Sequence, residues 1–400
     1  MTVWLIEPRD PVIFRDGRPF NASPGARAKT LAFPLPATMA GATRTRAGLD
    51  ANGRFDKRYI AELKQKQVRG PLLVEVKPDA SGEEITWLVP APADALLLKQ
   101  EPHDKTRAHI VPLTVVEDPA GVATNLPAQL ALVAPVQHAN QKPHSAAPAF
   151  WRWQAYQDWL ASPKVHEGAL LADWGLAGPV RESRMHVSVK SATQTAQDGA
   201  LFQTSGLEFV SLAPAKDASP PVLAQAKGLA LVLETDAELE PGLGFLGGER
   251  RLASWRLSPA SFPGCPDAVR KAIVDQKHCR LILATPAIFA GGFLPDVSKL
   301  SRAGVAVTVQ AVVNGRYQVV SGWDYESDRP KPTRRLASAG SVYFLKLEGG
   351  KDAINQFIDV VWLQAISDDE QDCRDGFGLA LLGAWDGEPK PFNYGLEVSK

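Results

Sequence analysis

Short apolar runs separated by polar turns characterise the N-terminal part of the chain. The run TVWLIEP at residues 2–8 predicts a strand, and Val12–Phe14 form a second apolar patch before a turn at Asp16–Gly17. Residues 71–78 (PLLVEVKP) and 84–92 (EITWLVPAP) predict a pair of strands.

A helix is predicted between these strands, after the prolines at positions 34 and 36 have stopped extended structure. Thr38 suits the first turn of this helix because its hydroxyl can accept a hydrogen bond from a free backbone N–H. In the predicted register, three apolar side chains face a core and three polar side chains stay in solvent. These are Met39, Ala42 and Leu49, and Thr43, Arg44 and Arg46, respectively.

The segment from about 93 to 180 is rich in Ala, Pro, His and Gln and shows weak periodicity, so we expect an irregular insertion that is partly loop. Within it, FWRWQAYQDWLAS predicts a short amphipathic helix over 150–160, with several tryptophans. Two interpretations stay open: the helix packs on its own domain, or it docks a partner protein.

The remainder of the chain is predicted to alternate strands, turns and one helix. Asn314–Gly315 favours a hairpin turn within VAVTVQAVVNGRYQVVSGWD, because both residue types tolerate φ > 0. The other predicted elements are a strand–turn–strand unit at 183–202, strands at 228–235, near 279 and at 341–349, a helix at 352–366, and a glycine turn into a strand at 376–385.

This order predicts the fold class. Two α+β domains built on antiparallel sheets fit it better than a doubly wound parallel sheet, and a second mixed set of elements starts near residue 260. No sequence repeat is visible between the two halves.

Composition limits the class of protein. The 400 residues are 45% hydrophobic and 22% charged, which is ordinary for a soluble globular chain with a real core. No apolar run approaches the ~18 residues of a spanning helix, and Glu7 interrupts any signal peptide. Cys265, Cys279 and Cys373 form neither a CxxC pair nor an even-numbered framework, so we expect a cytoplasmic protein without structural zinc.

Charge is balanced overall but is unevenly distributed. Lys plus Arg equal Asp plus Glu at 44 each, whereas residues 1–80 carry 14 basic residues against 8 acidic ones. A neutral protein with a basic region can still bind an anion locally.

No catalytic or metal-binding motif is evident in the sequence. The seven histidines lack HxH, HxxxH or HExxH spacing, and neither a GxSxG elbow nor a Walker lysine occurs. We therefore expect no metal, no cofactor and no small-molecule substrate. His186 lies in a predicted strand beside Arg184 and Lys190, and three roles remain open for it: a residue of the strand ladder, a ligand contact, or a catalytic base.

Glycine turns recur beside arginines. Gly247–Gly248 precede Arg250–Arg251, and Gly376–Gly378 follow Arg374. Backbone N–H groups freed by glycine, and those at a helix N-terminus, can hold phosphate oxygens, while arginine adds bidentate contacts. Phe377 has the ring that stacks on bases at single-stranded RNA sites. Any one of these turns is better explained as a tight hairpin with a solvated arginine, whereas several together favour an extended anion such as RNA. Further members of the pattern are the basic pair Arg334–Arg335 and the helix residues Thr38, Gly41 and Arg44.

Six segments between residues 5 and 385 read LIEPRDPVIFRDGRPF, FPLPATMAGATRTR, LGFLGGERRLASW, GGFLPD, VSGWDYESDRPKPTRRLASAGSVYF and GFGLALLGAW. In combination they resemble the RAMP-superfamily third subunit of the Cmr complex, the type III-B CRISPR effector. The resemblance implies two fused ferredoxin-like (RRM-like) domains with antiparallel sheets. Residues 1–255 would form the first, with the insertion at about 93–180, and residues 256–400 the second, with the glycine-rich loop.

The same resemblance implies a non-catalytic subunit that binds the 5′ handle of the CRISPR RNA (crRNA). Such subunits cap the foot of the complex, beside the large polymerase-like subunit and the first copy of the backbone RAMP subunit. The implied RNA-binding residues are Thr38, Gly41, Arg44, Arg46, Arg184, His186, Gly247, Gly248, Arg250, Arg251, Arg334, Arg335, Arg374, Gly376, Phe377 and Gly378. We expect Glu249 to orient Arg250 or Arg251 through a salt bridge, because a carboxylate would repel RNA.

Two alternatives remain at this point. One is a RAMP endoribonuclease that processes CRISPR RNA, with His186 beside Arg184 or Lys190 as its only candidate cluster. The other is a protein–protein adaptor without RNA contact, for which the Trp-rich helix is the supporting feature.

Overall fold

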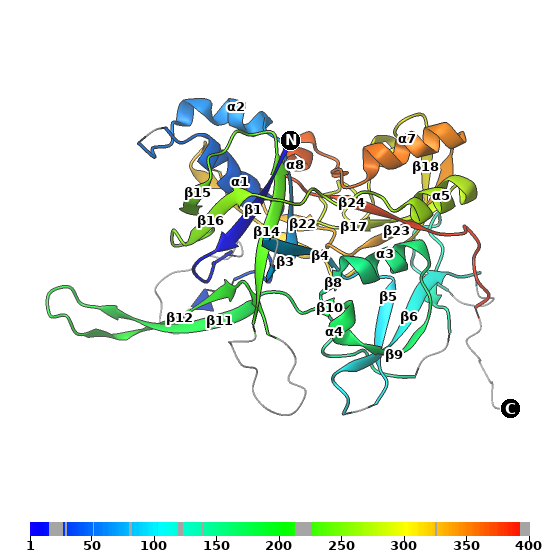
Figure 1. Cartoon of the computed structure of the whole chain (residues 1–400), viewed down its shortest axis with the longest axis horizontal. Helices are drawn as coiled ribbons and strands as arrows, with labels where there is room; N and C mark the ends of the chain where they lie inside the picture. Colours follow the sequence, from blue (N-terminus) through cyan, green and yellow to red (C-terminus); the bar gives the residue numbers. More distant parts are fainter. Residues whose placement is uncertain are drawn as a thin grey trace.

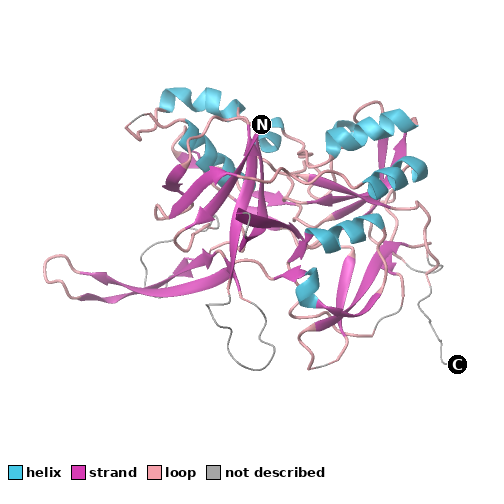
Figure 2. Ribbon diagram, in the orientation of Figure 1, coloured by secondary structure: helices cyan, strands magenta, loops and turns pink. Residues whose placement is uncertain are grey.

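A computed structural model describes residues 1–15, 27–28, 30–50, 52–79, 82–101, 103–118, 123–137, 140–212, 226–324 and 326–392. The turn predicted at Asp16–Gly17 lies outside these residues. The chain is a mixture of helices and mostly antiparallel sheets, as the sequence predicted. Figure 2 shows strands running through both halves of the molecule, with helices mainly along one side of them.

The largest sheet lies in the N-terminal half and has the strand order β10-β8-β4-β3-β14-β1-β16-β15, with β13 paired to β14 (Figure 1). Its strands are β1 Thr2–Pro8, β3 Val68–Asp79, β4 Gly82–Pro90, β8 Phe150–Arg152, β10 Gly175–Leu176, β13 Val210–Ser211, β14 Lys227–Thr235, β15 Gly242–Phe245 and β16 Leu252–Leu257. The strands predicted at 2–8, 71–78, 84–92 and 228–235 are thus confirmed.

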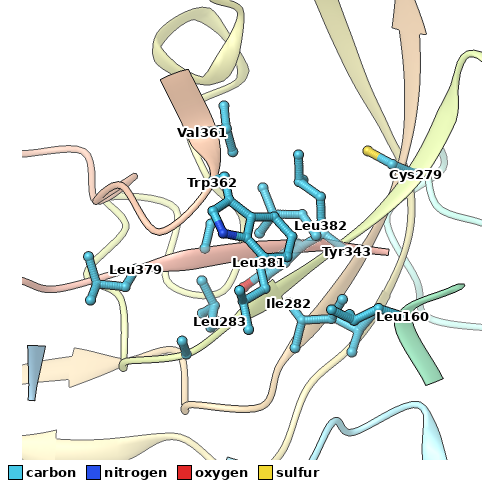
Figure 3. Packing of buried hydrophobic residues seen from close by; sticks show 14 of the residues in the cluster. Leu160, Cys279, Ile282, Leu283, Tyr343, Val361, Trp362, Leu379, Leu381 and Leu382 are labelled. Atoms are coloured by element: carbon cyan, nitrogen blue, oxygen red, sulfur yellow. The ribbon is translucent and has the colours of Figure 1, made fainter. Parts of the chain in front are cut away.

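The C-terminal half has a four-stranded sheet with the order β18-β23-β17-β24. Its strands are β17 His278–Leu283, β18 Ala306–Val313, β23 Val342–Glu348 and β24 Ala380–Ala384. The helices of this half are α5 Asp267–Gln276, α6 Val297–Leu300, α7 Lys351–Val361 and α8 Glu370–Arg374. In Figure 3, Trp362 lies among leucines of β24 and residues of β17, within a cluster of buried hydrophobic residues.

Four central strands of each half share one topology. Taken in chain order, the fourth strand pairs with the first, the first with the third, and the third with the second: β16-β1-β14-β3 in the N-terminal half and β24-β17-β23-β18 in the C-terminal half. All of these neighbouring pairs are antiparallel. The two halves therefore repeat an arrangement that the sequence did not show.

Helix α1 (Pro36–Ala47) packs its buried face on the large sheet, but in a register different from the predicted one. Its buried residues Pro36, Met39, Ala40 and Thr43 have the spacing i, i+3, i+4, i+7 of one helix face. Leu49 is 42% exposed. Thr43 is buried because it lies four residues after Met39 on the same helix face, Ala42 is half-buried and packs against the same cluster as predicted, and Leu49, beyond the end of the helix, is exposed.

The segment from 93 to 180 is more regular than expected. β5 Ala95–Lys99, β6 Arg107–Val115, β7 Val133–Pro135 and β9 His166–Leu170 form a sheet of their own, and α4 (Leu171–Trp174) follows β9. The predicted helix is present as α3 (Trp153–Ala161), whereas Phe150–Arg152 form strand β8 on the edge of β4. Since β8 and β10 extend the large sheet, this segment is built into the molecule and is not an irregular insertion.

The helix α3 packs inside the chain. Tyr156, Trp159 and Leu160 are buried within one hydrophobic cluster that also contains residues of β17 and β24. The buried face of the Trp-rich helix is therefore covered by this chain's own residues, and the helix does not support the adaptor alternative.

The prediction of a hairpin at Asn314–Gly315 is wrong, because the strands on either side of this turn do not pair with each other. β18 pairs with β23, so Val313 lies opposite Val342, and the chain between them forms small ribbons of its own. These are β19 Gln318–Val320 with β22 Arg334–Leu336, and β20 Trp323–Asp324 with β21 Arg329–Pro330. The local turn signal was overridden because β23, some 30 residues further on, supplies an apolar partner for β18.

The strand–turn–strand unit predicted at 183–202 is confirmed. β11 (Val180–Val189) and β12 (Ala196–Glu208) form a long hairpin that projects from the body of the molecule (Figure 1), and β2 (Arg27–Ala28) pairs with the base of β12. The short helices η1 (Lys57–Tyr59) and α2 (Ile60–Gln65) follow α1.

Candidate nucleic-acid interface

The loop LGGERR joins β15 to β16 in a tight turn that is closed by the hydrogen bond from Leu246 N to Arg251 O (2.8 Å). Gly247, Glu249 and Arg250 all have positive φ values, which only glycine adopts at little cost. A Cβ on Gly247 would lie 2.6 Å from the carbonyl oxygen of Ile13. Gly247 is therefore required by the close approach of two backbone segments.

The amide of Gly248 donates to Ile13 O at 2.7 Å. This N–H is used inside the protein, so the expected contact between it and a phosphate is not available. The two arginines of the loop have separate roles. Arg251 Nη2 binds Glu249 at 2.8 Å, which confirms the predicted salt bridge, whereas the guanidinium of Arg250 lies over the ring of Phe245, 4.4 Å from its centroid.

Arg46 of α1 covers the edge of the large sheet. Because Leu246 and Arg251 form a hydrogen-bonded pair, the carbonyl group of Leu243 points away from β16, toward the open edge. Arg46 Nη1 donates to that oxygen at 3.1 Å, and its Nε donates to Glu240 O at 3.0 Å. Burial lowers the pKa of Arg46 from its usual value, although the guanidinium stays charged at neutral pH. Arg46 thus blocks an unpaired strand edge, which would otherwise be open to another chain.

Arg44, two residues earlier on α1, connects the two halves of the chain. Its Nη1 pairs with Asp375 Oδ1 at 2.5 Å, and its Nη2 donates to Lys66 O at 2.8 Å and to Arg374 O at 3.2 Å. The side chain is only 12% exposed. On the same helix Gly41 is exposed, with no other atom within 4 Å of the position that a Cβ would take, and Thr38 is half-buried in the first turn.

The glycine loop at 376–378 is buried. A Cβ on Gly376 would lie 2.6 Å from Gly70 O and 2.7 Å from Val68 O, both in β3 of the other half. Three amides of the loop, those of Gly376, Phe377 and Gly378, donate to Cys373 O, Asp372 O and Pro286 O.

In this chain Gly376, Phe377 and Gly378 are buried and their three amides are bonded within the protein, so the contact with RNA expected for them stays a prediction without an exposed group to make it. The ring of Phe377 is fully buried in a small cluster with Leu35 and Leu336, so it is not available to stack on a base. The loop needs its glycines for packing, because it passes between the two halves of the chain.

Three further arginines that the resemblance implies as RNA-binding residues lie near the glycine loop at 376–378. Arg334 makes two 2.8 Å hydrogen bonds to Asp372, and Arg374 pairs with Glu370 one turn away on α8. Burial raises the pKa of Asp372, and Arg334 opposes that shift. Arg335 is exposed, and its guanidinium lies 5.0 Å from the centroid of the Tyr317 ring.

Arg184 and His186 lie apart from this region, on the projecting hairpin. Arg184 pairs with Glu182 at 2.7 Å. His186 Nε2 is 2.8 Å from Thr204 Oγ1, and its ring stacks on Phe202. His186 thus has the contacts of a ladder residue in a two-stranded ribbon. None of its contacts in the described part of the chain is with a carboxylate or a second histidine that would assist acid–base chemistry.

Nucleophilic and metal chemistry find little support in the described residues. Burial raises the pKa of the Cys265 and Cys373 thiols to about 11, so both stay protonated at neutral pH. No group of three His, Cys, Asp or Glu side chains that could hold a metal ion occurs among the residues the structure describes. Within the same residues, no helix is long and apolar enough to cross a membrane.

Three of the predicted motifs come together around α1. Arg46 binds the backbone at β15, beside the LGGERR loop, while Arg44 binds Asp375, beside the terminal glycine loop and Arg334. Two aromatic side chains at this interface, Phe245 and Tyr317, were missed in the sequence. For Phe245 the signal was its place five residues before Arg250 in a short strand. Tyr317 had no local signal, because only the pairing of β19 with β22 brings it close to Arg335.

The α+β fold with mostly antiparallel sheets, and with these motifs gathered around one helix, agrees with the class of protein that the sequence resembles. The family model for the CRISPR-associated protein Cas_Cmr3 matches residues 4–385. The chain therefore belongs to the Cas_Cmr3 family, and the resemblance to the third Cmr subunit is confirmed.

Solved structures with a similar chain include two cryo-EM structures of the type III-B Cmr-beta complex. One, bound to cognate target RNA and AMPPnP, has 13% identity and a TM-score of 0.45, and the match covers 90% of this chain and 88% of that one. The other, bound to cognate target RNA, has 14% identity, a TM-score of 0.45 and 86% coverage of each chain. A crystal structure of the Csm3–Csm4 subcomplex of the type III-A interference complex matches at 10% identity and a TM-score of 0.32, covering 88% of this chain and 94% of that one. No curated protein matches the sequence.

Proposed function

We propose that this protein is a non-catalytic, RNA-binding subunit of a type III-B CRISPR effector and holds the 5′ handle of the crRNA. The observation that carries the proposal is the gathering of the family's motifs around α1, where Arg44 and Arg46 connect two loops that lie about 130 residues apart in the sequence. Arginines contributed by both halves around one helix would suit an extended anion such as single-stranded RNA.

The proposed place in the complex is the foot, beside the large polymerase-like subunit and the first backbone RAMP subunit. The RNA would follow the exposed arginines and the open face of α1 at Gly41, since the buried glycine loop offers no surface. Acidic surface elsewhere, such as that carried by Asp368–Glu370, would remain for contacts with protein subunits.

We also propose that the two halves are ferredoxin-like domains, with a boundary near residue 255. The shared strand order, fourth-first-third-second, supports this assignment. The helix expected between the third and fourth strands is replaced by β15 and its loop in the N-terminal half, whereas α7 occupies that place in the C-terminal half.

The test is to co-express the tagged chain with the rest of its operon and to sequence the small RNAs that copurify. We expect RNAs that share one 5′ handle. A double Arg250→Glu, Arg251→Glu variant should lower their recovery, and the salt-dependence slope should fall by about 0.7 for each lost phosphate contact.

The matched control reverses the same amount of charge on α5 and α7, with Lys271→Glu and Lys351→Glu. Both lysines are exposed and lie in the C-terminal half, away from α1. Unchanged RNA recovery and salt dependence in the arginine variant would contradict a role of the LGGERR loop in RNA binding. Wild-type complexes without handle-bearing RNA would contradict the proposed function itself.

A further inference from the structure

Two exposed aromatic rings on this protein each carry an arginine guanidinium on one face. Phe245, at the end of β15, is 52% exposed and lies 4.4 Å from Arg250. Tyr317, just before β19, is 55% exposed and lies 5.0 Å from Arg335. One pair belongs to each half of the chain, and both flank the region held together by α1.

These two arginines differ from the other candidate arginines in their electrostatic environment. Arg250 and Arg335 have no carboxylate partner in the part of the chain that the structure describes. The others are paired with acids or with backbone carbonyl groups: Arg44 with Asp375, Arg46 with Glu240 O and Leu243 O, Arg184 with Glu182, Arg251 with Glu249, Arg334 with Asp372, and Arg374 with Glu370. The two pairs therefore combine a flat apolar ring with an uncompensated positive charge.

The backbone of the LGGERR loop positions Arg250 over Phe245 in the first pair. Glu249 and Arg250 both have positive φ values, 58° and 53°, which cost free energy in residues with a Cβ. This turn brings the Arg250 side chain back over the ring of Phe245. On the same sheet face, Leu252 lies directly opposite Phe245 and is 36% exposed, so two neighbouring apolar side chains are open to solvent there.

We propose that Phe245 with Arg250, and Tyr317 with Arg335, are base-stacking positions for unpaired nucleotides of the bound RNA. The inference rests on the proposed function and deepens it. A base can stack on an aromatic ring or on a guanidinium plane, and the charge of the arginine is attracted to the adjacent phosphate. These positions take the role that the sequence suggested for Phe377, whose ring is buried.

The experiment uses the assembled complex, reconstituted with synthetic crRNAs that carry 2-aminopurine at one handle position at a time. Stacking on a ring changes the fluorescence of this base. We expect Phe245→Ala and Tyr317→Ala each to change the signal at a small and different set of positions. Each should weaken handle retention about tenfold without altering the salt-dependence slope, because no phosphate contact is lost.

Two sets of variants act as controls. Phe245→Tyr and Tyr317→Phe keep a flat ring and should retain wild-type fluorescence and affinity. Phe293→Ala removes another exposed aromatic side chain, 40% exposed, over which the structure places no arginine in the described residues, and it should have no effect.

Three outcomes would overturn the inference. If RNA is retained but neither alanine variant changes the signal at any position, the rings do not stack on bases, and the proposed function stands. If either variant releases the subunit from its protein partners while the remaining complex keeps its RNA, the ring is a protein contact. If the wild-type complex holds no handle RNA at all, the proposed function fails together with the inference.

Discussion

At the residue scale, glycine and arginine in the motifs act in two distinct ways that depend on burial. Gly376 is buried and permits close contact between the two halves, whereas Gly41 is exposed and has open space beside it. Arg44 is committed to an internal ion pair, while Arg250 is free of carboxylates in the described residues and lies on an exposed ring. Residue type alone did not distinguish the buried positions from the exposed ones, because glycine and arginine occur at both.

We predict that Gly376→Ala destabilises the protein by about 2 kcal/mol or more, because φ is +91° and the new Cβ would meet two carbonyl oxygens of β3. Thermal unfolding measures the loss. Gly264→Ala is the control, since nothing lies within 4 Å of its Cβ position, and it should leave the melting temperature nearly unchanged. Equal melting temperatures for both variants would show that the loop does not pack against β3.

At the element scale, one buried ion pair attaches the 93–180 segment to the C-terminal sheet. Arg280 Nη1, in β17, lies 2.5 Å from Asp94 Oδ2, and the two side chains are 2% and 1% exposed. Arg280 also donates to the carbonyl oxygens of Ala384, Trp159 and Leu160, and the Trp159 indole N–H donates to Asp94 at 2.9 Å. This network connects β17, α3 and β24, and it explains why a segment with weak periodicity folds against the rest of the chain.

We predict that Arg280→Met lowers the free energy of unfolding by about 3–5 kcal/mol, because Asp94 is left buried with its charge uncompensated. Arg270→Met is the matched control. It breaks the pair with Asp359, whose side chain is 63% exposed, and should cost about 1 kcal/mol or less. Denaturant unfolding compares the two, and similar losses would contradict the structural role assigned to Arg280.

At the scale of the whole molecule, the two halves share a hydrophobic cluster. A single cluster contains Leu5 and Leu72 of the large sheet together with Leu281 and Phe344 of the C-terminal sheet, and Figure 3 shows part of it. The ion pair of Arg44 and the buried glycine loop add polar connections across the same junction. The halves repeat a strand order, yet they are not built as independent bodies.

We therefore predict one cooperative thermal transition for the full chain, since neither half can unfold without exposing apolar residues of the cluster that the two halves share. Differential scanning calorimetry should give equal calorimetric and van't Hoff enthalpies. Two resolved transitions would mean that the halves unfold separately despite the shared cluster.

Much of this protein follows from its sequence alone. Apolar runs such as TVWLIEP and the strand pair near residue 80 specify their own conformation, because local propensity and alternation agree there with the final sheet. The combination of motifs from residue 5 to residue 385 was enough to indicate the family. The salt bridge between Glu249 and Arg251 was also within reach, since the two residues are close in the chain.

What only the tertiary structure decided concerns partners distant in sequence. Phe377 is buried because Leu35 and Leu336 reach it from elsewhere in the chain, and Asn314–Gly315 form no hairpin because β23 pairs with β18 instead. Likewise, the guanidinium of Arg335 lies over the ring of Tyr317 because β22 pairs with β19. Burial and pairing at such positions depend on long-range packing, which neither periodicity nor a motif records.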